Sequence, residues 1–117
     1  MNLEIVTGKS WTVSAQRLSA GEPVPFITGD TLRAQIRETP AGAVLVTVAA
    51  AIVTPADGTY TLTLTDELTA TLPQPAHFSA VRPVWLDVDI IRGTDVLPTI
   101  VNEKIYVRAG VTLTEGE

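Results

Sequence analysis

The chain contains no cysteine, so disulfides, thiolate metal ligands and cysteine nucleophiles are all excluded. Its single histidine, His77, lies in a proline-flanked segment, and no Gly-x-Ser-x-Gly motif accompanies it. A serine–histidine–aspartate triad would depend on that one residue. The sequence therefore predicts no catalytic residue, no metal site and no cofactor.

Charge is also scarce, since only 18% of the 117 residues are charged and 13 acidic residues outnumber 8 basic ones. The lysines and arginines are scattered, so no basic patch is expected to attract phosphate backbones or anionic lipids. The most apolar stretch, residues 41–53, is shorter than the roughly 20 residues of a membrane helix. The start of the chain lacks a secretory signal. We expect neither a nucleic acid nor a membrane as partner.

The sequence is rich instead in alternating β-formers. The clearest example follows the turn Asp57-Gly58, where Tyr60, Leu62 and Leu64 alternate with threonines. This period of two predicts a half-buried strand with both leucines in the core. Similar extended segments are expected at residues 3–6, 10–18, 31–38, 43–48, 84–91 and 96–107.

The connections between these segments are equally informative. Ala49–Ala51 is interpreted as a crossing between sheets or a bulge, because strands flank it. Asp66–Leu72 is predicted to be a short helix, with Thr65 as its N-cap and Pro73 at its end. The whole pattern predicts an all-β protein. We expect one antiparallel sandwich of seven or eight short strands over residues 1–117, with a short acidic tail at 110–117.

Asp87 and Asp89 are the main candidates for metal chemistry, because both carboxylates lie on one face of the strand 84–91, roughly 7 Å apart. Such pairs bind Ca²⁺ or act as acid and base. The simpler interpretation is a solvated pair, or one matched by basic residues on a neighbouring strand. The loop acids Asp57, Asp66 and Glu67 match no calcium loop.

Trp11 and Trp85 allow an alternative function. If both rings were exposed on one surface, they would form a platform for a carbohydrate of a host surface. The competing interpretation is that each packs in the core or at an interface.

The termini have the character of unpaired edge strands. Leu3–Val6 and Val111–Leu113 are short and apolar. A lone soluble monomer does not need a mean hydropathy as high as +0.26 with only 18% charged residues. Exposed edges add to the sheets of neighbouring molecules. We therefore expect a homo-oligomer, with interface residues Leu3, Ile5, Val111 and Leu113.

Three stretches in this order resemble a known family: Gly29–Arg37, Ile52–Glu67 and Trp85–Thr112. They are similar to the immunoglobulin-like domain at the N-terminus of phage baseplate upper proteins, which also occurs in small phage and prophage proteins. The resemblance implies an immunoglobulin-like sandwich without enzymatic activity. It also implies a structural or assembly role in a virion that is assembled in the host cytoplasm, with other virion proteins as partners. Baseplate upper proteins continue beyond this domain, so a tail, baseplate, neck, head-decoration or fibre-adaptor position remains open.

Overall fold

Ten short strands and two helical turns make up the computed structural model, which describes residues 4–73, 75 and 81–109. The strands are β1 (Glu4–Val6), β2 (Trp11–Gln16), β3 (Leu18–Ser19), β4 (Glu22–Pro23), β5 (Asp30–Arg37), β6 (Val44–Thr54), β7 (Thr59–Leu64), β8 (Val81–Arg92), β9 (Asp95–Val96) and β10 (Val101–Arg108). The helical turns are η1 (Pro55–Asp57) and α1 (Asp66–Thr69). The predicted all-β class is confirmed.

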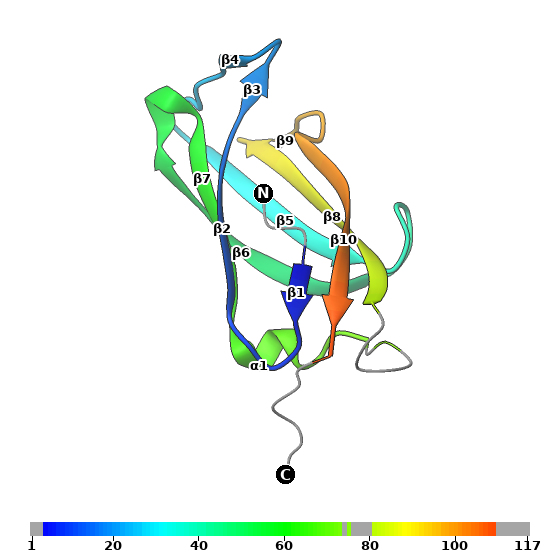
Figure 1. Cartoon of the computed structure of the whole chain (residues 1–117). Coiled ribbons are helices and arrows are strands. Elements are labelled where there is room, and N and C mark those ends of the chain that lie inside the picture. Colours follow the sequence, from blue (N-terminus) through cyan, green and yellow to red (C-terminus); the bar gives the residue numbers. More distant parts are fainter. Residues whose placement is uncertain (1–3, 74, 76–80, 110–117) are drawn as a thin grey trace.

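Seven of the strands follow one path, β1-β10-β8-β5-β6-β7-β2, which folds over into two layers (Figure 1). Strand β9 pairs with β8 beside this path, and β3 and β4 form a separate two-stranded sheet. Strand β6 belongs to both layers. Its Val44–Val48 part pairs with β5, and its Ala49–Thr54 part pairs with β7. The predicted sheet crossing at Ala49–Ala51 is therefore confirmed, and it forms the kind of corner that lets one strand serve two sheets.

Apart from the first strand, β1, the strand order follows that of immunoglobulin-like sandwiches, which place the second, fifth and fourth strands in one sheet and the third, sixth and seventh in the other. Here these sets are β2-β7-β6 and β5-β8-β10. Every pairing is antiparallel except that of β1 with β10, which is parallel and places Ile5 beside Val107.

The core lies between the two layers, and the alternating patterns identify its members. Leu62 and Leu64 are fully buried, as predicted, and so are Leu86, Val88 and Ile90 on β8. Ile105 and Val107 on β10 are fully buried as well.

Helix α1 closes the end of the sandwich opposite the β3-β4 hairpin (Figure 1). The Thr65 hydroxyl accepts a hydrogen bond from Leu68 N at 3.3 Å, which confirms the predicted N-cap. Buried Thr69 accepts from Gly8 N at 3.0 Å and donates to Lys9 O at 2.9 Å, so the helix is fixed to the β1–β2 turn. Among residues 4–73, 75 and 81–109, no helix has the length and apolar character that a membrane span requires.

Candidate functional site

Three connections meet at one end of the sandwich, called the loop end below (Figure 1). They are residues 17–29 between β2 and β5, which include the β3-β4 hairpin, residues 55–58 between β6 and β7, and residues 93–100 between β8 and β10. In sandwiches of this topology, such connections often carry recognition while the sheets hold them in place.

Backbone hydrogen bonds fix the loop end. Arg17 N donates to Gly58 O at 2.7 Å, Val24 N donates to Arg17 O at 2.8 Å, and Phe26 N donates to Pro55 O at 2.8 Å. Gly58 has a φ of 71°, and a Cβ atom there would lie 2.3 Å from Val24 O. The Asp57-Gly58 turn thus does more than reverse the chain, because its glycine lets the 17–24 segment approach closely.

A cleft of about 650 Å³, called the end cleft, opens between the β3-β4 hairpin and the 97–101 segment. Apolar side chains line it on both sides, namely Leu18, Val24, Leu97 and Ile100, together with the polar residues Gln16, Ser19 and Thr99. The 97–101 wall is attached to β8, because Leu97 N donates to Ile90 O and Ile100 N donates to Val88 O, both at 2.9 Å.

Tyr60 and Glu103 add polar groups to the end cleft. Burial raises the pKa of Tyr60, and the nearby Glu103 carboxylate raises it further, so the phenol stays neutral at neutral pH. Arg17 also lines the cleft, but its guanidinium donates to Pro25 O at 3.1 Å and lies 5.7 Å from the centre of the Phe26 ring.

A second, smaller hollow of about 400 Å³ lies beside residues 26–30. Ile27, Ile52, Val53 and Pro55 contribute to its lining. The side chains of Ile27 and Val53 are 52% and 59% exposed. The loop end therefore presents two hollows bordered by exposed apolar groups.

Asp87 and Asp89 both pair with arginines of β5. Arg37 Nε lies 2.8 Å from Asp87 Oδ2, and Arg33 Nη2 lies 2.9 Å from Asp89 Oδ2. Burial acts to raise the pKa of Asp89, but hydrogen bonds from Thr99 and Arg33 outweigh it and hold the pKa below its usual value. Ion pairing with a neighbouring strand is thus the interpretation that the geometry supports.

The contact between Thr99 and Asp89 has a structural consequence for the end cleft. Thr99 Oγ1 donates to Asp89 Oδ1 at 2.7 Å, so Asp89 anchors the 97–101 wall. In the described part of the chain, no group of three or more His, Asp or Glu side chains gathers as a metal would require.

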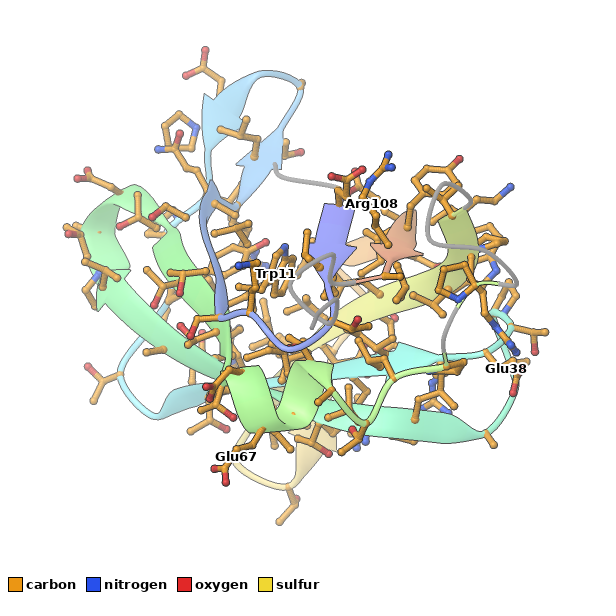
Figure 2. All side chains as sticks on the ribbon, turned by 60° about the horizontal axis from the view of Figure 1, so that its bottom comes forward. Trp11, Glu38, Glu67 and Arg108 are labelled. Carbon is orange, nitrogen blue, oxygen red and sulfur yellow. The ribbon has the colours of Figure 1, made fainter. Side chains whose placement is uncertain are left out.

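The proposed pair of exposed tryptophans is wrong. Trp11 is only 3% exposed, and Figure 2 shows it pointing into the interior while Glu67 points outward from α1. Trp11 packs inward because Val13, two residues later on the same strand, is also in the core. Trp85 is half-buried, and Lys104 Nζ lies 5.6 Å from the centre of its ring. No two-ring carbohydrate platform exists.

Ile5 also requires correction. It was expected to form an intermolecular contact, but its side chain is fully buried because β1 pairs with β10 and directs Ile5 into the chain's own core. The other expected interface residues, Leu3, Val111 and Leu113, lie outside the described residues, as does His77.

No protein-family model matches the chain, and no curated protein sequence matches it significantly. The resemblance to phage baseplate domains stays a prediction.

Glu103 is the residue of the end cleft that the sequence analysis missed. Its position could have been predicted from the sequence. Glu103 alternates in step with Val101, Ile105 and Val107, so its side chain lies on the same face of the last strand as theirs. A carboxylate in an otherwise apolar, inward-facing series marks the place where the sandwich opens to solvent.

Proposed function

We propose that this chain is a structural or assembly protein of a phage-type virion, acting through protein–protein contacts and without catalysis. It is built into the particle in the host cytoplasm, as a tail, baseplate, neck, head-decoration or fibre-adaptor component, alongside other virion proteins. The sequence resemblance motivates the virion assignment, and the immunoglobulin-like strand order is consistent with it.

One observation carries the protein-contact part of the proposal. Among the described residues, the four large apolar side chains with the greatest exposure are each more than half exposed. Leu18, Ile27 and Val96 lie at the loop end, and Val53 lies next to it near the end of β6. Exposed apolar side chains concentrated at one end of a domain favour a contact with another protein there.

Self-assembly is a second part of the proposal. In the described chain, β1 and β2 stand at the two ends of the strand path, and each pairs on one side only. An end strand offers backbone donors and acceptors to a neighbouring molecule. Assembly of identical or related subunits through these edges would leave the loop end free for a different partner.

The virion assignment is tested on particles. Phage-like particles from the source strain are purified through a density gradient, and each fraction is analysed by quantitative mass spectrometry. We expect the chain to co-purify with the particles at a constant ratio to the major capsid protein. Particles that lack the chain, although it accumulates in the particle-free lysate, would refute the virion role.

A further inference from the structure

We propose that the end cleft binds an arginine or lysine side chain, flanked by apolar residues, from a segment of a partner protein. The inference deepens the proposed contact role, and it rests on that role only in taking the occupant to be a polypeptide. Three observations lead to it: the direction of Glu103, the absence of a partner for its charge, and the apolar walls around it.

The strand register gives the direction of Glu103. Directly opposite residues of antiparallel strands direct their side chains to the same face. Glu103 lies opposite Leu86, and Ile105 lies opposite Val84. Leu86, Val84 and Ile105 are all fully buried, so Glu103 faces the inside of the sandwich. It is exposed only because the layers separate there into the end cleft.

The charge of Glu103 has no partner within the described part of the chain, where no hydrogen bond or ion pair to its carboxylate is found. By contrast, five other carboxylates pair with arginines, namely those of Glu4, Asp30, Glu38, Asp87 and Asp89. The one cation in the cleft lining, Arg17, is directed to Pro25 O and the Phe26 ring instead.

An unmatched carboxylate in this setting favours a cationic occupant. A docked guanidinium or ammonium group would form a charge-assisted hydrogen bond with Glu103, and the exclusion of water by the partner would strengthen it. The neutral Tyr60 phenol lines the same cleft and adds no second charge. An acidic or phosphorylated segment would be repelled.

The apolar side chains that line the end cleft favour apolar residues on either side of the bound basic side chain. Leu18 is 55% exposed on one side, and Leu97 and Ile100 lie on the other. Long basic side chains place their methylene groups along apolar surface while the charged end remains polar. A cleft of about 650 Å³ has room for such a side chain together with its neighbours in a peptide.

The test is an NMR titration of the full-length, ¹⁵N-labelled chain at low ionic strength. Three capped tripeptides serve as probes: acetyl-Leu-Arg-Leu-amide, the same peptide with norleucine in the middle, and the same peptide with glutamate in the middle. We expect the arginine peptide to shift the amide resonances of residues 16–19 and 97–103 in a saturable way. The norleucine and glutamate peptides should bind at least about tenfold more weakly.

Two variants identify the groups responsible. Glu103→Gln should weaken binding of the arginine peptide to the level of the norleucine peptide, and added salt should do the same to the wild-type chain. Leu18→Ala should weaken all peptides. The matched control is Glu22→Gln, which removes an equal charge from the nearby exposed strand β4, outside the lining, and should change nothing.

The proposal is overturned if the arginine peptide produces no saturable shifts at the cleft, if the glutamate peptide binds equally well, or if Glu103→Gln binds as the wild type does. None of these results bears on the virion assignment, which is decided by the composition of the particles. Conversely, particles without the chain would leave measured peptide binding unchanged.

Discussion

Arg92 binds Asp30 through two hydrogen bonds, from Nε to Oδ1 at 2.8 Å and from Nη2 to Oδ2 at 2.9 Å. The two residues lie directly opposite each other on β8 and β5. The buried Asp30 carboxylate also accepts from Ile27 N at 3.0 Å. The Asp30 carboxylate thus connects the start of β5 to β8 and to the loop residue Ile27, which borders the second hollow.

This arrangement predicts a specific acid sensitivity. The hydrogen bond from Arg92 is the main cause that lowers the pKa of Asp30 from 3.8 to about 2. Because the folded pKa is below the unfolded one, the ionised carboxylate stabilises the fold above about pH 4, and this contribution is lost as the pH falls through about 2. Urea unfolding at stepped pH should show the free energy of unfolding decreasing across this interval.

Asp30→Asn should make the free energy of unfolding fall less steeply as the pH decreases. It should also lower the free energy of unfolding at neutral pH by about 1–3 kcal/mol, because charge-assisted hydrogen bonds are lost. Asp95→Asn, at an exposed position of β9, is the control and should behave as the wild type does. An unchanged pH slope in Asp30→Asn would contradict the prediction.

The burial of Leu62 on β7 predicts how much stability is lost when its side chain is shortened. Leu62 is fully buried, so Leu62→Ala should lower the free energy of unfolding by about 2–5 kcal/mol through lost burial and the cavity left behind. Thr63→Ala changes the neighbouring, outward-facing position and should cost less than about 1 kcal/mol. Chemical denaturation measures both, and a comparable loss in the two variants would show that the faces are reversed.

Trp11 permits a sharper test of packing. Its Nε1 atom is buried and has no hydrogen-bond partner among the described residues. Trp11→Phe removes this donor and keeps much of the apolar ring, so we expect a change within about 1 kcal/mol. Trp11→Ala should cost about 3–5 kcal/mol. Equal losses for the two variants would indicate that the indole nitrogen is bonded in solution.

The proposed edge assembly predicts that self-association depends on β2. Ser14 is exposed on this end strand, and a lysine there should hinder strand addition. Thr61 lies directly opposite on the central strand β7, so Thr61→Lys adds the same charge to the same face away from the edge. Light scattering across a concentration series should show weaker association for Ser14→Lys alone. A chain that stays monomeric throughout, or two variants that respond alike, would exclude edge assembly through β2.

The features that sequence analysis predicted correctly were local ones. The alternation in 59–65 and 84–91 identified the apolar side chains of the core, and Thr65 determined where α1 begins. Asp89 is buried although it alternates with these core residues. The crossing at Ala49–Ala51 could be inferred because strand-like residues flank it on both sides.

The errors concerned contacts between distant segments. Trp11 is the exception, because its alternation with Val13 already places it on the core face. The burial of Ile5 depends on the pairing of β1 with β10, and alternation within one strand does not contain that information. The end cleft was missed for the same reason, since β2, β3, β7 and the 97–101 segment all contribute to it.

The parallel pairing of β1 with β10 has a mechanical consequence. The pairs Glu4–Tyr106, Ile5–Val107 and Val6–Arg108 join the first and last strands of the described chain side by side. A stretching force that pulls the start of β1 away from the end of β10 acts along these strands, so their hydrogen bonds are sheared together and cannot open one at a time. We expect the sandwich to resist tension along this axis better than a fold whose terminal strands peel apart from one end.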